Sequence, residues 1–243
     1  MGIYDRDYIK SVGSGSTAQA AYGGVVADVA GRNKVLRNTY MLLGLSMIPT
    51  VIGALVGMNM NFAFMAQHPI MYTLVMFGVM MGLFFGIQAN RNSGLGVVLL
   101  LVLTGFMGLM LGPILQFALH FRNGGQIVGL AAGGTGAIFL ALSAIASSPK
   151  RDFSFLGKFL MVGIVLLILA MLANMFFHIP ALALTLSAAA VLLFSGFILF
   201  DVNRIVRGGE TNYVMATLSI YLDIYNLFIY LLQLLMMLMG QRD

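Results

Sequence analysis

The chain has 243 residues, of which 60% are hydrophobic and 9% charged, and its mean hydropathy is +0.97. These values exclude an ordinary soluble domain and predict an all-α polytopic membrane protein. The net charge of +5 does not indicate a nucleic-acid partner, because the basic residues lie between apolar runs, and the absence of cysteine excludes disulfides and thiolate chemistry.

Residues 1–34 are rich in Gly, Ser and Ala with scattered charges. They contain too few large apolar side chains to build a core, so we expect a flexible cytoplasmic tail followed by a transmembrane domain over 35–243. The tail is either an unstructured leader or a handle for a protease or another partner. Because no short apolar run ends in a small-residue cleavage site, we expect no removable signal peptide.

Apolar runs of about 20 residues, enough to cross a hydrocarbon core of roughly 30 Å, recur from residue 39 almost to the C-terminus. The connections between them are too short for further domains. The sequence therefore predicts seven transmembrane helices, over 39–58, 70–89, 94–116, 126–146, 156–177, 181–202 and 214–239.

The distribution of Lys and Arg predicts the orientation, because positively charged short loops are retained in the cytoplasm. If the spans alternate, only Arg122 and Arg242 fall on one side. The N-terminus is then cytoplasmic and the C-terminus external. The other eleven lie on the cytoplasmic side: Arg6, Lys10, Arg32, Lys34, Arg37, Arg91, Lys150, Arg151, Lys158, Arg204 and Arg207.

Glycines recur every three or four residues in three of the spans, where they form smooth stripes that another helix can approach closely. Tight helix packing is the prediction for these positions. Pro113 is expected to kink the third span. The glycines are Gly78, Gly82 and Gly86, then Gly105, Gly108 and Gly112, then Gly129 and Gly133.

The last span carries a polar stripe through apolar sequence. Its members are spaced by three or four residues, so a helix places them on one face, and that face should point away from lipid. The stripe consists of Ser219, Asp223, Asn226, Tyr230 and Gln233.

A second acid, Asp201, lies near the end of the preceding span, and Gly208 and Gly209 favour a turn between the two helices. In an antiparallel hairpin Asp201 and Asp223 come to similar depths, one or two turns apart. Two nearby carboxylates resist double ionisation, so the pair is expected to hold one proton that a cation can replace. The structural alternative pairs Asp201 with Arg204 and buries Asp223 in a hydrogen-bond network.

Metal chemistry has weak support in the sequence. Asp201 and Asp223 suit a weakly bound or transported Ca²⁺, but they offer fewer ligands than a tight site uses, so no tightly bound cofactor is expected. The scattered methionines form no metal-binding box. His68, His120 and His178 fall in external connections, and no metal is assigned to them.

Several motifs resemble one family of membrane proteins. They are KVLRNTYMLLGLS before and in the first span, LGPIL at 111–115, FSFLGKFLMVGI opening the fifth span, and the hairpin that starts FDVNRIVRGGETNYVMATLSIYLDIYNLFIYLLQ. Together they resemble the Bax inhibitor-1 family, particularly its bacterial YccA-like branch, over nearly everything from residue 34 onward.

This resemblance implies six helices around a central, largely apolar seventh, with a paired-aspartate site that Asp201 and Asp223 match. It implies a pH-sensitive calcium leak channel of a bacterial inner membrane, gated by protonation of that pair. Arg91, at the cytoplasmic end of the second span, is the candidate that would pair with an aspartate in a closed state; Arg204 is a second candidate for a gate or counter-charge.

The same resemblance supports an alternative, in which the chain regulates a membrane AAA protease in membrane-protein quality control without conducting ions. A third class, an intramembrane aspartyl protease, would use two aspartates on adjacent spans as general acid and base. Such enzymes carry YD and GxGD motifs, whereas this chain has FD at 200–201 and IYLD ending at Asp223. The prediction is therefore a protein that is not an enzyme.

Overall fold

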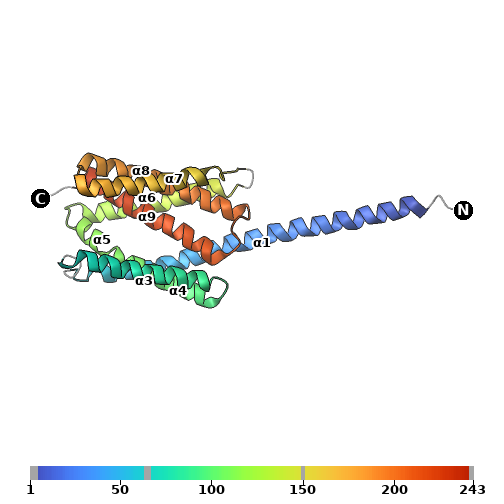
Figure 1. Ribbon diagram of the computed structural model, residues 1–243, viewed down its shortest axis with the longest axis horizontal. Helices are drawn as coiled ribbons and strands as arrows, with labels where there is room; N and C mark the ends of the chain where they lie inside the picture. The colour runs from blue at the N-terminus through green and yellow to red at the C-terminus, as the bar shows by residue number, and fades with distance from the viewer. Residues whose placement is uncertain (1–4, 63–66, 149–150, 241–243) are drawn as a thin grey trace.

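The computed structural model describes residues 5–62, 67–148 and 151–240, with side chains described from residue 31 onward, and all regular structure in these ranges is helical. Figure 1 shows the helices arranged side by side as a bundle. The helices are α1 (Asp5–Met58), α3 (Pro69–Ala89), α4 (Gly94–Met110), α5 (Gly112–Leu119), α6 (Gly124–Ala146), α7 (Leu156–Phe177), α8 (Pro180–Val206) and α9 (Tyr213–Met239).

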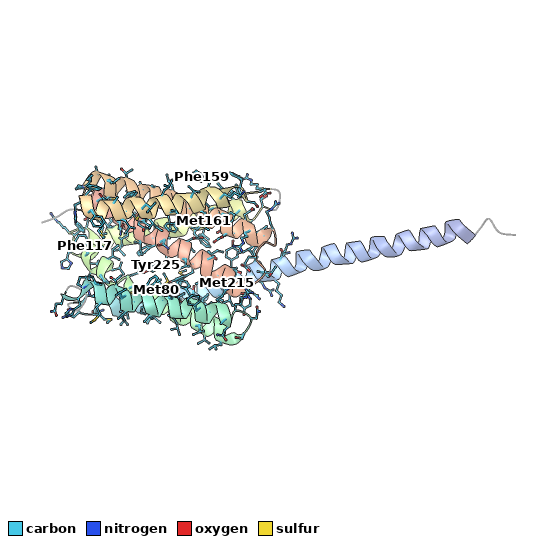
Figure 2. The ribbon with its side chains drawn as sticks, in the orientation of Figure 1. Met80, Phe117, Phe159, Met161, Met215 and Tyr225 are labelled. Atoms are coloured by element: carbon cyan, nitrogen blue, oxygen red, sulfur yellow. The ribbon has the colours of Figure 1, made fainter. Side chains whose placement is uncertain are left out.

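Seven helical segments in the described ranges are long and apolar enough to cross a membrane, which confirms the predicted spans. The first is the C-terminal part of α1 and ends at Met58, and the third, Gly94–Leu119, contains both α4 and α5. Large apolar side chains on the outside, such as Phe159 and Met161, point away from the bundle, as expected for a surface in contact with lipid (Figure 2).

The third span is interrupted at Leu111, as expected from Pro113. The Leu111 N–H donates to the Gly108 carbonyl, 3.0 Å away, in a tighter turn than the α-helix makes, and α5 then begins with proline in its first turn. Proline lacks an N–H and its ring crowds the carbonyl of the residue four positions earlier, so the α-helical ladder cannot continue through this position.

The closest helix approach joins α1 to α4 and α5. A Cβ added at Gly53 would overlap the Gly105 carbonyl oxygen, and one added at Gly108 would overlap that of Thr50. Gly112 lies equally close to the Gly57 carbonyl. The packing role predicted for the glycines of the third span is therefore confirmed, and the structure adds their partners on α1.

The same prediction is wrong for four other glycines, as far as contacts within the chain are concerned. A Cβ added at Gly78, Gly82, Gly129 or Gly133 would meet nothing within 4 Å, although one at Gly86 would lie 3.2 Å from Leu99. The physical reason is that these faces of α3 and α6 point outward, where a glycine stripe has no neighbouring helix.

This difference predicts opposite effects for two matched substitutions. Gly108→Val places a branched side chain against the backbone of α1, and such overpacking should lower stability by about 3 kcal/mol or more, because the helices must separate. Gly82→Val faces open space and should change little. Thermal unfolding in detergent measures both, and equal midpoints for the two variants would contradict the close crossing.

Residues 5–30 form the first part of α1 and project away from the bundle (Figure 1). The sequence predicts a flexible tail over 1–34, whereas the described part of that segment is helical and continuous with the first span. No proline precedes Pro49 and alanines are frequent, so nothing in the composition breaks the helix. The tail's flexibility and the division at residue 35 stay predictions.

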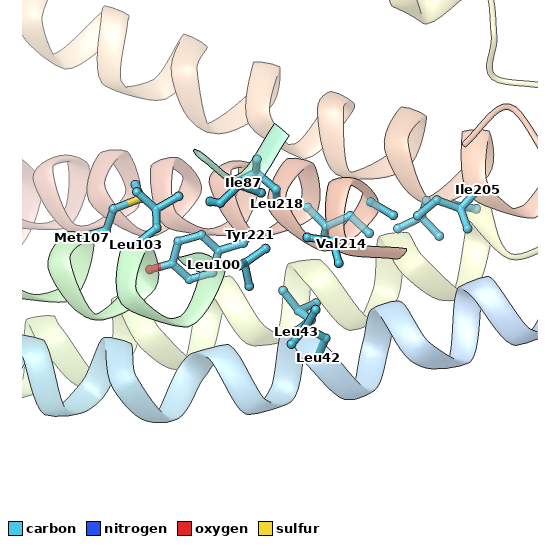
Figure 3. Packing of buried hydrophobic residues seen from close by; sticks show 14 residues of the cluster. Leu42, Leu43, Ile87, Leu100, Leu103, Met107, Ile205, Val214, Leu218 and Tyr221 are labelled. Atoms are coloured by element: carbon cyan, nitrogen blue, oxygen red, sulfur yellow. The ribbon is translucent and has the colours of Figure 1, made fainter. Parts of the chain in front are cut away.

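The C-terminal helix α9 packs against α8, α6, α1 and α4, while α3 packs against α4 and α7 against α8. The predicted arrangement of six helices around a central seventh therefore stays a prediction. A core of apolar side chains from α1, α4, α8 and α9 surrounds Tyr221 at this junction, as Figure 3 shows for Leu43, Leu100 and Val214.

Candidate functional site

The two predicted aspartates meet between α8 and α9. The Asp201 and Asp223 carboxyl groups lie within hydrogen-bonding reach of each other. Asp223 is 7% exposed, and its Oδ2 is buried without a hydrogen-bond partner. Ionised carboxylates only accept hydrogen bonds, so one proton on the pair is the donor that would satisfy both groups.

The charged groups that act on Asp201, apart from Asp223, are Arg204 and Glu210. Arg204 forms its ion pair with Glu210, at 3.6 Å, so it does not neutralise Asp201 by direct contact. The charge that acts on Asp223 is Asp201 itself. Asp201 and Asp223 would therefore repel each other if both were ionised, and the nearest cation, Arg204, is partly exposed.

The backbone carbonyl of Arg91 accepts a hydrogen bond from Asn212, at the start of α9. The Asn212 Nδ2 donates to the Arg91 carbonyl (2.9 Å) and to Asn92 Oδ1 (2.7 Å), while Asn212 Oδ1 accepts from the Val214 and Met215 N–H groups at the start of α9. The structure shows no ion pair between Arg91 and either aspartate. A role for Arg91 as gate or counter-charge stays a prediction.

The other members of the polar stripe have separate environments. Ser219 is partly buried, and Asn226 Nδ2 donates to the Leu222 carbonyl of its own helix (2.8 Å). The Tyr230 hydroxyl donates to Met171 Sδ at 3.4 Å. Gln233 lines a cavity of about 900 Å³ between α5, α8 and α9. The stripe thus extends along α9 from the aspartate pair to this cavity, but its members do not hydrogen-bond to one another in a continuous chain.

A second polar network, which was not predicted from the sequence, lies on the side of α9 that faces α1 and α4. The Thr50 hydroxyl lies 2.8 Å from the Ser46 carbonyl and 3.2 Å from the Thr104 carbonyl. The Tyr221 hydroxyl lies 2.9 Å from Thr50 Oγ1 and 3.3 Å from the same Thr104 carbonyl, so each hydroxyl has a hydrogen-bond acceptor in this network. The available signal was a pair of tyrosines four residues apart, since Tyr225 also donates across the interface, to the Met107 carbonyl at 3.0 Å.

Removing one hydroxyl tests this network. Tyr221→Phe leaves the ring in place but removes one buried hydroxyl and its hydrogen bond to Thr50 or to the Thr104 carbonyl, so we expect the free energy of unfolding to fall by about 1–2 kcal/mol. Tyr213→Phe is the matched control, because its hydroxyl bonds to no described residue. Chemical or thermal unfolding of the purified chain would show the difference, and identical stability of the two variants would exclude the network as a contributor.

Calcium binding stays a prediction. Within the described residues, no cluster of three or more His, Cys, Asp or Glu side chains could hold a metal ion. Calcium usually takes about six to eight oxygen ligands, so Asp201 and Asp223 would need water and backbone oxygens to complete even a weak site.

The chain is similar to known bacterial proteins over most of its length. The family model described as "Inhibitor of apoptosis-promoting Bax1" matches residues 32–241. An uncharacterised protein of Neisseria meningitidis serogroup B is 43% identical over 88% of this chain and 96% of its own length. An uncharacterised membrane protein of Vibrio cholerae is 43% identical over 84% of this chain and 89% of its own length.

A third relative has a functional name. The "Modulator of FtsH protease YccA" of Escherichia coli K12 is 41% identical over 204 residues, which cover 84% of this chain and 90% of that protein. Its counterpart in another Escherichia coli strain is named an inner membrane protein, with the same identity and coverage. These names describe a membrane protein and a regulator of a protease.

Proposed function

The chain belongs to the Bax inhibitor-1 family, and from this premise we propose that it modulates a membrane-bound AAA protease in a bacterial inner membrane. Its identity with the named protease modulator extends over most of both chains, which supports the proposal. The proposed orientation has the N-terminus in the cytoplasm, because most of the Lys and Arg residues then lie on the cytoplasmic side.

The observation that carries the proposal is the helical extension of α1. Residues 5–30 project beyond the bundle over roughly 39 Å, at about 1.5 Å per residue (Figure 1). They include Gly13, Gly15, Gly23 and Gly24. Each glycine costs about 1 kcal/mol relative to alanine in a helix, so this extension unfolds more easily than the spans. An ATP-driven protease needs such a segment to begin pulling.

The bundle that follows resists the same pull. The close crossing of α1 with α4 leaves no room for sliding, because backbone meets backbone at Gly53 and Gly108. The Gln116 Nε2 also donates to the carbonyls of Met58 and Met60, each at 2.9 Å, and holds the far end of the first span. The protease can bind and unfold the extension of α1, but the packed spans resist being pulled out of the membrane. Such a chain occupies the protease longer than an ordinary substrate does, and so lowers its activity on other substrates.

Capture of the protease tests this function. Full-length chain should retain a solubilised membrane AAA protease on an affinity support, and a variant lacking residues 2–30 should not. Equal capture by the two forms would contradict recognition through the extension.

The buried aspartate pair supports a second function, a pH-sensitive cation leak with calcium as the proposed ion. In the proposed closed state the pair holds one proton, and loss of that proton leaves two like charges that repel each other or attract a cation. The cavity at Gln233 would be the external end of the path.

Packed side chains lie along α9 between the pair and the cavity. Leu227 is fully buried, and Tyr230 stacks on Phe194 with ring centroids 5.8 Å apart. Conduction therefore requires α8 and α9 to shift relative to each other. Repulsion between two ionised aspartates on these same helices would supply the force, which makes pH the proposed signal.

A further inference from the structure

A second, smaller cavity lies at the end of the bundle where α7 begins and α8 ends. It has a volume of about 330 Å³ and is lined by Ser154, Phe200, Asn203, Arg204, Arg207 and Gly209. This volume is at the lower end of the range for small-molecule sites, about 300–1,000 Å³, and is large enough for a phosphate with part of a headgroup.

The two arginines are the donors that remain available in this cavity. Their side chains are 45% and 39% exposed, and each contacts one carboxylate: Arg204 contacts Glu210 at 3.6 Å, and Arg207 contacts Asp152 at 3.0 Å. A guanidinium has five N–H donors, so both arginines keep donors for a further acceptor. The Arg204 contact is long, and exposed pairs of this kind stabilise by only about 0–1 kcal/mol, so Arg204 can turn toward a phosphate.

The walls of the cavity are fixed by other contacts. Asn203 Nδ2 donates to the carbonyls of Ala146 (3.1 Å) and Arg151 (3.0 Å), and its Oδ1 accepts from the Phe153 N–H. Hydrogen bonds from Ser154, and then the Arg207 guanidinium, hold the pKa of Asp152 below its usual value. Asp152 is therefore ionised near neutral pH and keeps Arg207 in place.

The surroundings indicate the class of ligand. Phe155 and Phe159, at the start of α7, are 72% and 70% exposed, as expected for side chains beside acyl chains. The exposed Arg151 and Lys158 lie within four residues of the lining residue Ser154 in sequence, and Arg204 and Arg207 line the cavity themselves. Positive charge at the boundary between polar and apolar surface fits a molecule with an anionic head and apolar tails.

We propose that this cavity binds the headgroup phosphate of an anionic phospholipid, with Arg204 and Arg207 as its ligands. Basic pockets between transmembrane helices on the cytoplasmic side suit such headgroups, and the planar fork of arginine matches two phosphate oxygens. The bound lipid would brace the connection before α7 against the end of α8, next to Asp201.

Lipid titration of the full-length chain tests the proposal. Phosphatidylglycerol added to the purified chain should raise its midpoint of thermal unfolding and remain bound in native mass spectrometry. Phosphatidylcholine should do so much less, and inorganic phosphate should have no effect. Equal effects of the two lipids would overturn the anionic site, and an effect of phosphate alone equal to that of phosphatidylglycerol would overturn the lipid as its source.

Variants locate the site. The double variant Arg204→Gln, Arg207→Gln should weaken phosphatidylglycerol binding by at least about tenfold, since each arginine near the surface contributes to the attraction. Arg122→Gln removes one positive charge from an exposed position in the connection between α5 and α6 and should leave binding unchanged. Unweakened binding by a double variant with wild-type stability in phosphatidylcholine would place the lipid elsewhere. If the double variant does not fold, the wild-type lipid comparison decides the proposal by itself.

Discussion

Deletion of residues 2–30 is expected to abolish modulation of the membrane protease while the seven-span bundle stays folded. The deleted segment projects from the bundle, and the first span lies after it in α1 (Figure 1). Loss of this segment removes the part of the chain that the protease is proposed to bind and leaves the helix packing of the spans intact. Degradation of a reporter substrate in cells that produce either form measures modulation, and thermal unfolding checks that the bundle is preserved.

A variant of unchanged length provides the matched control. Replacing Gly13, Gly15, Gly23 and Gly24 by alanine stabilises the helical extension by up to about 4 kcal/mol without shortening it. If the protease must unfold this helix to engage the chain, the alanine variant should be engaged more slowly than wild type but faster than the deletion. Full modulation by the deletion variant would show that another surface is recognised.

Asp223→Asn is expected to remove the pH dependence of cation flux, if the chain conducts. An amide can donate a hydrogen bond to Asp201 at every pH, so the pair would stay in its closed contact without a titrating proton. Wild-type flux should be greater at the higher of two pH values than at the lower, because ionisation of both acids separates them. Release of a calcium-sensitive dye signal in loaded proteoliposomes measures this flux.

Asp152→Asn is the control for the aspartate variant. It also removes one carboxylate from the predicted cytoplasmic half of the chain, but from an exposed connection where Asp152 pairs with Arg207. Its flux should keep the wild-type pH dependence. Flux that is the same in wild type and in Asp223→Asn at both pH values would exclude Asp223 as the group that makes a leak pH-dependent.

The spans could be predicted from sequence because their length and apolarity follow directly from the thickness of a bilayer. The break at Pro113 followed from the chemistry of one residue. The aspartate pair followed from two local facts, two acids in apolar sequence and a glycine turn between them, so the hairpin brought Asp201 and Asp223 together without any knowledge of the other helices.

Contacts between distant helices could not be predicted in this way. Tyr221 and Thr50 are separated by 171 positions, and nothing local to either residue identifies the other. The glycine stripes show the same limit: Gly108 meets a backbone and Gly82 meets nothing, although both lie in similar small-residue patterns. The pattern permits close approach, and only the arrangement of helices decides where it occurs. The helical extension differed from the prediction because a polar, glycine-containing segment lacks a core but not the capacity to continue an adjacent helix.

The two proposed functions use different parts of the molecule, so they can be separated. Protease modulation depends on residues 5–30 and on the resistance of the bundle, whereas a cation leak depends on Asp201, Asp223 and movement of α9. The deletion of residues 2–30 should therefore leave pH-dependent flux unchanged, and Asp223→Asn should leave protease capture unchanged.

The most direct test of protease modulation is a reconstitution from purified components. A membrane AAA protease and a reporter membrane substrate would be placed in liposomes, and substrate turnover would be followed as the full-length chain is added. We predict that turnover falls to a plateau as the chain occupies the protease. Turnover that stays constant at saturating amounts of the chain would contradict the proposed function.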